Sequence, residues 1–209
     1  MTSSLYERFG DRLAGVDRVK IFDWVFGIVH GLGFPVDTSL LAMAIHDKMV
    51  LQCPASKMTK ARYFTLVLAC VWIAVKFEHE EAGRGGWPYV HTHILCHCPE
   101  ESPRPRSSRG WFGTWERAVL RYCGLTVPLS MLITRRVPPE HVQSPRVVAT
   151  CALAVRSLPV YEMNLTEVAW SCVRVALGQM EADCVLDETI NLLVCTCIAR
   201  YAPSGDVRV

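Results

Sequence analysis

The sequence predicts an all-α protein built from two helical lobes. Apolar residues recur at helical spacing along most of the chain, and no Asn-Gly pair of the kind that closes a β-hairpin is present. Hydrophobic residues make up 51% of the 209 residues, which is enough to form a substantial buried core. A proline-rich connector separates five predicted helices from three more. We therefore expect one lobe over residues 1–128 and a shorter lobe over residues 129–209.

The first two helices are predicted from their apolar faces and their ends. Residues 16–33 carry an apolar face at helical spacing, and glycines followed by a proline end this helix. Asp37 or Thr38 is then expected to cap a second helix that continues to about residue 51.

The third helix, expected over residues 59–77, is apolar on nearly all sides between residues 63 and 75. Such a helix must be surrounded by neighbours. Its apolar run is shorter than the roughly 20 residues that span a bilayer, so we expect a buried helix and no membrane partner. A short fourth helix is expected over residues 88–98.

The rest of the chain alternates between proline-rich segments and helices. Residues 99–110 contain three prolines and three arginines and are predicted to form a surface loop. A fifth helix should cover residues 112–123, and residues 125–145, with four prolines, should form the connector. Three helices are expected after it, over residues 145–158, 164–177 and 182–201, with Ser144 and Asn164 as caps of the first two.

Charge and cysteine content exclude several classes of protein. The chain has 22 Lys and Arg against 20 Asp and Glu, and this near-neutral balance argues against a nucleic-acid binder that depends on phosphate contacts. The first residues lack the apolar region of a signal peptide. The ten cysteines are therefore expected in a reducing compartment, mostly as small buried side chains.

One cluster has the chemistry of a zinc site: His91, His93, Cys96, His97 and Cys98. On a helix, three of them could share a face. The cluster has no second Cys/His pair at zinc-finger spacing, so packing in the fourth helix is the favoured interpretation and no metal is expected. No nucleophile motif, phosphate loop or metalloprotease pattern occurs, so we expect neither an enzyme nor a cofactor.

Four segments in order along the chain share a pattern: residues 17–34 (DRVKIFDWVFGIVHGLGF), 40–52 (LLAMAIHDKMVLQ), 66–81 (LVLACVWIAVKFEHEE) and 115–130 (WERAVLRYCGLTVPLS). Together they resemble the cyclin box, the five-helix unit of the cyclin family. Residues 144–155 resemble the central helix of the second lobe of D-type cyclins, although that lobe is abridged here. The resemblance spans residues 16–201. In its compactness, the chain is similar to viral cyclins.

The resemblance implies a regulatory subunit that binds and activates a cyclin-dependent kinase as a 1:1 heterodimer and so affects cell-cycle progression. It would act in the nucleus and cytoplasm, of a host cell if the protein is viral. By resemblance, Lys76 donates to backbone carbonyls beside the kinase αC helix, and Glu116, close to Lys76, accepts backbone N–H groups. Phe77 and Leu120 would add apolar contact. The structural alternatives are an ordinary lysine at a helix end and a solvated acid.

Two further expectations follow from the resemblance. Arg18 and Asp47 should pair and join the first two helices. A groove that docks short Arg-x-Leu-type substrate motifs would involve Ile21, Trp24 and Asp17. Because Asp17 and Lys20 place charge at this groove, we expect it to be weakened and Trp24 to act mainly in the core.

The leading function has one alternative of another class. A cyclin-fold interaction module that binds a transcription or host factor without activating a kinase would show the same helices. The arrangement of Lys76 and Glu116 distinguishes the two, because adjacent side chains flanked by exposed apolar residues favour the activator.

Overall fold

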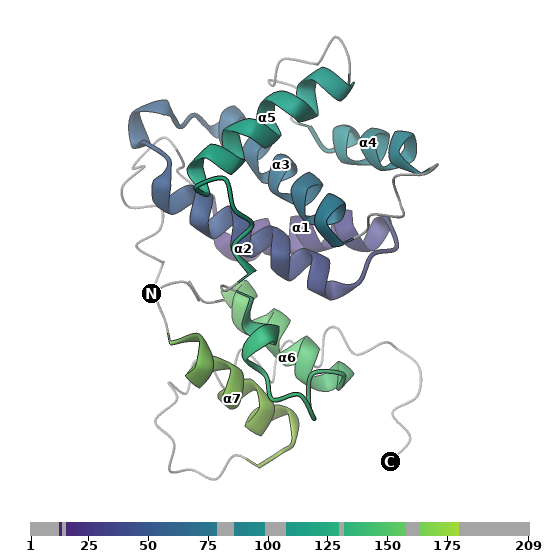
Figure 1. The fold of residues 1–209 in the computed structure, drawn as a ribbon, viewed down its shortest axis with the longest axis vertical. Coiled ribbons are helices and arrows are strands. Elements are labelled where there is room, and N and C mark those ends of the chain that lie inside the picture. Colours follow the sequence, from purple (N-terminus) through teal and green to yellow (C-terminus); the bar gives the residue numbers. More distant parts are fainter. Residues whose placement is uncertain are drawn as a thin grey trace. The chain divides into compact units, whose positions relative to one another are not determined.

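The structure is a computed structural model of the 209-residue chain and describes residues 13, 16–78, 86–98, 108–129, 132–157 and 164–179. Every regular element within these residues is a helix, so the all-α prediction is confirmed (Figure 1). The chain divides into two compact units, Met1–Leu132 and Ile133–Val209, and each is described by itself.

Helix α1, Arg18–Gly31, has a side-chain cap at its start and a left-handed glycine after its end. The Asp17 carboxylate accepts the backbone N–H of Val19 at 2.9 Å, which satisfies one of the donors exposed at a helix start. Beyond the C-terminus, Gly33 adopts φ of +76°, a left-handed conformation that glycine takes without strain. The buried face of α1 includes Ile21, Val25 and Ile28.

Helix α2, Val36–Gln52, starts earlier than its predicted cap. Neither Asp37 nor Thr38 caps it, because both lie inside the helix and the N-cap is Pro35, which makes no side-chain cap bond. Proline supplies the extended backbone of an N-cap, with φ of −69° and ψ of 163°, without needing a side-chain acceptor. Asp37 instead lies in the first turn, where a negative charge suits the helix dipole.

Helix α3, Lys60–Glu78, lies at the centre of the first unit and contacts α1, α2, α4 and α5 (Figure 1). Each residue from 66 to 75 is at most 6% exposed, so the prediction of a helix buried on all sides is confirmed. A short 3-10 turn, Ala55–Lys57, joins α2 to α3. None of the helices that the structure describes is long and apolar enough to cross a bilayer.

Helices α4, Trp87–Cys96, and α5, Ser108–Tyr122, complete the first unit as far as it is described. The prediction for residues 108–110 was wrong, because they form the first turn of α5 rather than the end of a loop. Trp111 is only 6% exposed and Phe112 only 2% exposed. Their packing in the core outweighs the weak helix propensity of Gly110. Residues 99–107 of the expected loop lie outside the described residues.

The second unit contains a 3-10 turn, Ile133–Arg136, followed by α6, Pro145–Ser157, and α7, Leu165–Ala176. The two α-helices contact each other, and their buried residues include Cys151, Ala154 and Ala169. Asn164 caps α7 by accepting the Thr166 N–H at 3.2 Å, as predicted. The helix expected over residues 182–201 lies outside the described residues.

The cysteines of the described residues are free thiols. Five of them are buried: Cys53, Cys70, Cys123, Cys151 and Cys172. Burial raises the pKa of the Cys123 thiol to about 11 and raises the pKa of the Cys70 thiol well above its ordinary value of 9.0, so these thiols stay protonated and pack as small apolar groups.

Candidate partner-binding site

Helices α3 and α5 bring two charged side chains together at the surface of the first unit. Lys76 lies in the last turn of α3, where the apolar run ends, and Glu116 lies in the middle of α5. Lys76 Nζ is 2.7 Å from Glu116 Oε1, although 40 positions of sequence separate the two residues. The burial of α3 fixes where its exposed C-terminal turn emerges, and the contact between α3 and α5 fixes its neighbour.

Trp72 is the third member of this site. It precedes Lys76 by one helical turn, and its indole Nε1 donates to Glu116 Oε2 at 3.0 Å. Lys76 Nζ also lies 5.6 Å from the centre of the Trp72 ring, within cation–π range. The Glu116 carboxylate is therefore held by a donor on each oxygen, which fixes its orientation before any partner arrives. We call Trp72, Lys76 and Glu116 the charged triad.

The charged triad keeps unused hydrogen-bonding capacity toward solvent. The side chain of Lys76 is 42% exposed and that of Glu116 is 21% exposed. An ammonium group has three donors, and each carboxylate oxygen has two lone pairs, so the contacts within the triad leave donors on Lys76 and acceptors on Glu116. Such a pair can bind backbone carbonyl and N–H groups of another protein at the same time.

Apolar side chains flank the triad. Phe77 follows Lys76 in the last turn of α3 and is 45% exposed. Leu120 lies one turn after Glu116 on α5 and is half-buried. Both residues therefore present part of their apolar surface on the elements that carry the charged pair.

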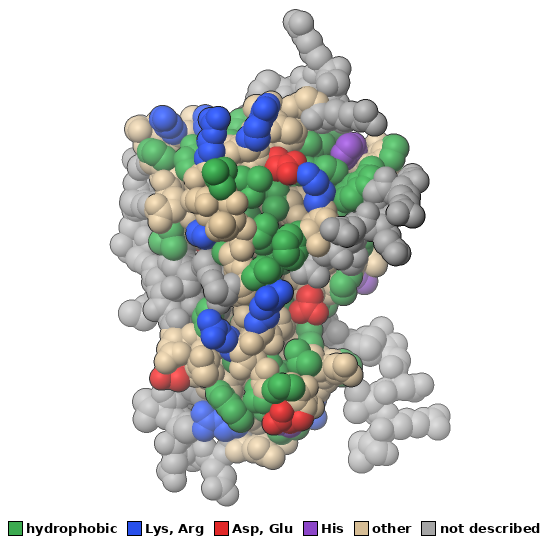
Figure 2. All heavy atoms as spheres, viewed as in Figure 1, with side chains coloured by type: hydrophobic (Ala, Val, Ile, Leu, Met, Phe, Trp, Pro, Cys, Tyr) green, Lys and Arg blue, Asp and Glu red, His purple; other side chains and the backbone are tan. Residues whose placement is uncertain are grey.

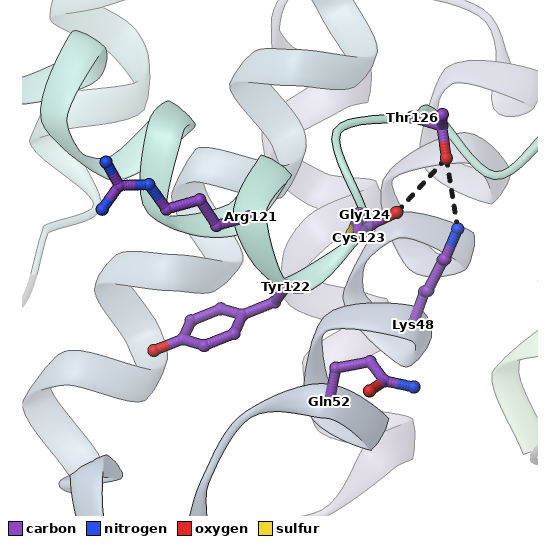
Figure 3. A pocket seen from close by; sticks show the side chains of 7 residues that line it. All are labelled: Lys48, Gln52, Arg121, Tyr122, Cys123, Gly124 and Thr126. Atoms are coloured by element: carbon purple, nitrogen blue, oxygen red, sulfur yellow. Dashed lines mark hydrogen bonds between the residues drawn. The ribbon is translucent and has the colours of Figure 1, made fainter.

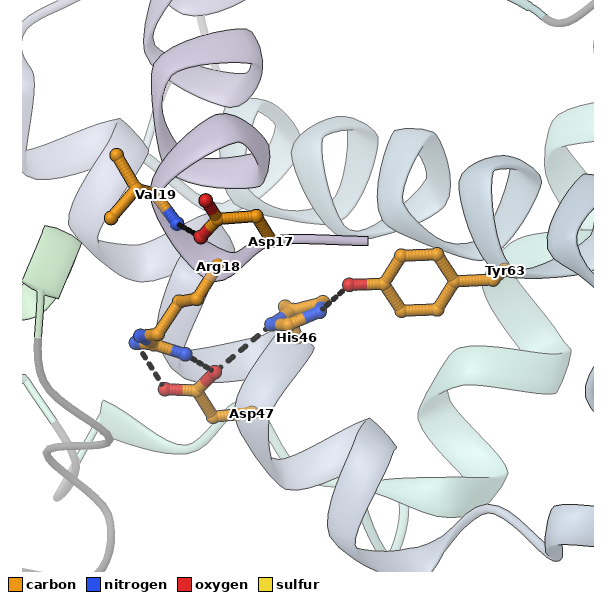
Figure 4. Close-up of polar contacts among 6 residues, drawn as sticks. All are labelled: Asp17, Arg18, Val19, His46, Asp47 and Tyr63. Atoms are coloured by element: carbon orange, nitrogen blue, oxygen red, sulfur yellow. Dashed lines mark hydrogen bonds and ion pairs between the residues drawn. The ribbon is translucent and has the colours of Figure 1, made fainter. Parts of the chain in front are cut away.

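Arg18 and Asp47 form a buried pair between α1 and α2 (Figure 4). The guanidinium donates from Nη1 to Oδ1 and from Nη2 to Oδ2, the second bond at 2.8 Å. The side chains are 5% and 0% exposed. This two-bond arrangement fixes both distance and angle, so the pair ties the N-terminus of α1 to α2.

The pair continues into a chain of buried hydrogen bonds that sequence reasoning missed. His46 Nδ1 lies 2.9 Å from Asp47 Oδ1, and His46 Nε2 lies 2.7 Å from the Tyr63 hydroxyl (Figure 4). Because a carboxylate only accepts, Nδ1 carries a proton, and the other ring nitrogen, Nε2, is hydrogen-bonded to the Tyr63 hydroxyl. The network therefore satisfies the polar atoms of a buried histidine and joins α2 to α3.

The electrostatics of Asp47 are set by its partners. Burial alone raises the pKa of this carboxyl, but the Arg18 charge and the hydrogen bonds from His46 and Arg18 more than offset it, so the pKa lies below its ordinary value of 3.8. Asp47 is thus a buried carboxylate that is kept ionised by a charge-assisted network.

The residues expected at the docking groove have structural contacts of their own. Asp17 caps α1, and Ile21 is only 3% exposed, so its side chain lies in the core. Trp24 is half-buried and packs edge-on against Phe64, with ring centroids 5.4 Å apart. Trp24 and Asp17 keep some exposed surface, whereas Ile21 has almost none.

The histidines of α4 pack against neighbouring helices. His91 stacks on Phe112 with centroids 4.7 Å apart, and His93 lies against Gly31 at the end of α1. His97 follows one turn after His93, at 5.3 Å between ring centroids. In the part of the chain that is described, no three His, Cys, Asp or Glu side chains converge in a way that could hold a metal ion.

A scan against models of protein families found no match for this chain, and a search of curated protein sequences found no significant match.

Proposed function

We propose that this protein is a cyclin-like regulatory subunit that binds and activates a cyclin-dependent kinase. The observation that carries the proposal is the convergence of Lys76 and Glu116 on one surface, at 2.7 Å, with donors and acceptors still available to a partner. It is supported by the order of the cyclin-like segments along the chain and by the burial of the central helix, which holds the third segment.

The mechanism requires a rigid surface rather than a catalytic group. A kinase is active when its αC Glu pairs with the β3 Lys and its activation loop is ordered. A partner that binds only this arrangement shifts the kinase population toward it. Lys76 would donate to backbone carbonyls beside αC, Glu116 would accept backbone N–H groups, and Phe77 and Leu120 would bury apolar surface around them. Affinity at such an interface depends on a few central residues.

The direct test combines the substitutions Lys76→Ala and Glu116→Ala and measures capture of recombinant cyclin-dependent kinases. We expect kinase capture to be abolished while the far-UV circular dichroism stays helical, because the pair is partly exposed and the loss of the Trp72 acceptor costs only about 1–3 kcal/mol. Arg136→Ala with Glu140→Ala is the matched control, since it removes one base and one acid from exposed positions in the second unit. Retention of the kinase by the first variant would reject the assignment.

A phosphorylation assay on the captured complex then separates activation from binding alone. Phosphate transfer to a histone or retinoblastoma-type substrate supports the activator. A kinase that binds through the charged triad but stays inactive would instead indicate an interaction module.

A further inference from the structure

A second surface of the first unit surrounds Tyr122, at the end of α5. One pocket of about 400 Å³ is lined by the C-terminal part of α2 and the end of α5, including Lys48, Gln52 and Thr126 (Figure 3). A second pocket of about 530 Å³ is lined by Lys57, Arg62, Ala118 and two residues that also line the first pocket, Arg121 and Tyr122. We call this pair of adjoining pockets the Tyr122 groove.

The Tyr122 groove contains four cations and no acid among its lining residues: Lys48, Lys57, Arg62 and Arg121. Within the described residues, none of the four forms an ion pair with a carboxylate. Figure 2 shows Lys and Arg side chains gathered over α5 and over the segment that joins α2 to α3. Neighbouring cations without counter-charges repel one another, and an anionic ligand removes that repulsion.

The hydrogen-bonding groups of these side chains are incompletely used. Lys48 Nζ donates to Thr126 Oγ1 at a long 3.3 Å and has two further donors. Arg62 packs over the Trp115 ring at 5.7 Å, and its side chain interacts with that of Tyr122. The groove therefore offers positive charge, with donors on Lys48 left for a ligand.

The arrangement fits an extended ligand better than a single small anion. In Figure 3 the Lys48 ammonium and the Arg121 guanidinium lie on opposite sides of the view, with the Tyr122 side chain between them. A ligand with several anionic groups can pair with both cations. The second pocket adds the methyl group of Ala118 and the face of Tyr122, which suit an apolar side chain.

We propose that the Tyr122 groove binds an acidic segment of a partner protein, with carboxylates on both sides of Tyr122 and an apolar side chain against Ala118. A peptide is favoured over nucleic acid because the second pocket is partly apolar and because the net charge of the whole chain is only +2. The inference goes beyond the proposed kinase binding, since Lys76 and Glu116 line neither pocket.

The test measures fluorescence anisotropy of a short labelled peptide that repeats Glu-Glu-Leu-Glu, with a peptide carrying Gln for every Glu as its control. The acidic peptide should bind, the Gln peptide should not, and added salt should weaken binding. Lys57→Gln with Arg121→Gln should weaken it about tenfold, because each lost charge contributes about 0.7 kcal/mol. Arg135→Gln with Arg136→Gln removes the same charge from exposed positions of the second unit and should leave the affinity unchanged.

Several results would overturn the inference. They are absence of binding at low ionic strength, equal weakening by both double variants, or tighter binding of oligothymidylate with the same dependence on Lys57 and Arg121. Should circular dichroism show that the first double variant is unfolded, Lys48→Gln provides the test, with about threefold weaker binding expected and an unchanged affinity counting against the groove. Kinase capture by the folded groove variants should persist.

Discussion

At the scale of single residues, the two charged pairs of this protein have opposite roles because their burial differs. Arg18 and Asp47 are shielded from water, whereas Lys76 and Glu116 are partly exposed. A buried ion pair fixes geometry, and losing one partner leaves an uncompensated charge in the interior. An exposed pair contributes little to stability and remains available for binding.

Replacement of Asp47 by alanine should therefore be strongly destabilising. It leaves the Arg18 guanidinium buried without its carboxylate and removes the acceptor of His46. We expect the free energy of unfolding to fall by roughly 3–5 kcal/mol. Urea denaturation measures this, with Lys76→Ala as the partly exposed comparison, for which a loss below about 1 kcal/mol is expected. Equal losses in the two cases would show that the buried pair has no special role.

Trp72→Phe tests whether Glu116 is preorganised for its partner. The substitution keeps an aromatic ring in α3 but deletes the Nε1 donor that holds Glu116 Oε2. If the proposed function is right, kinase affinity should fall by about 1 kcal/mol, or roughly fivefold, because Glu116 then loses rotamer freedom only on binding. Titration calorimetry of wild type and variant measures the change. An unchanged affinity would mean that Lys76 alone orients the carboxylate.

At the scale of elements, the contact between α1 and α4 depends on the absence of a side chain. A Cβ atom added at Gly31 would lie 3.0 Å from His93 Nε2, so α4 or the imidazole would have to move. Gly27, earlier in α1, has no atom within 4 Å of the corresponding position. Gly27 therefore has room for a methyl side chain, whereas Gly31 does not.

Gly31→Ala and Gly27→Ala should consequently change stability in opposite directions. Alanine at Gly27 should raise the unfolding free energy by about 0.5–1 kcal/mol through reduced backbone entropy. Alanine at Gly31 should lower it by roughly 1 kcal/mol through overpacking, and His93→Ala in the same chain should remove that penalty. Thermal melts of the single and double variants decide the matter. A stabilising Gly31→Ala would show that α4 adjusts without cost.

Sequence patterns predicted the helices where burial is extreme and failed where ends depend on tertiary contact. The buried run of α3 could be identified from composition alone. The start of α5 could not, because Ser108–Gly110 are helical only through the packing of the aromatic residues that follow. Similarly, the i, i+4 spacing of Trp72 and Lys76 was visible, but a hydrogen bond from an indole to a carboxylate on another helix is not encoded in spacing.

At the scale of the whole molecule, two of the described groups make folding depend on pH below neutrality. The pKa of Asp47 lies below its ordinary 3.8 in the folded protein. The pKa of His97 lies below its ordinary value of 6.5, mainly because the ring is partly buried and to a lesser extent because of the charge of His93. In both cases the unfolded chain binds more protons than the folded chain between the two pKa values, so stability rises with pH across each window.

We therefore expect the free energy of unfolding to be greatest near neutral pH, to decrease as pH falls below about 6.5 and to decrease again below about 3.8. The first decrease should be small, since the His97 ring is only partly buried, and His97→Gln should reduce it without affecting the second. The second should be larger, because protonation of Asp47 breaks its buried ion pair with Arg18. Urea denaturation at a series of pH values, for wild type and His97→Gln, measures both. If the difference in unfolding free energy between the wild type and His97→Gln is the same at pH 7 and pH 5, folding does not lower the pKa of His97, and its ring is not partly buried in solution.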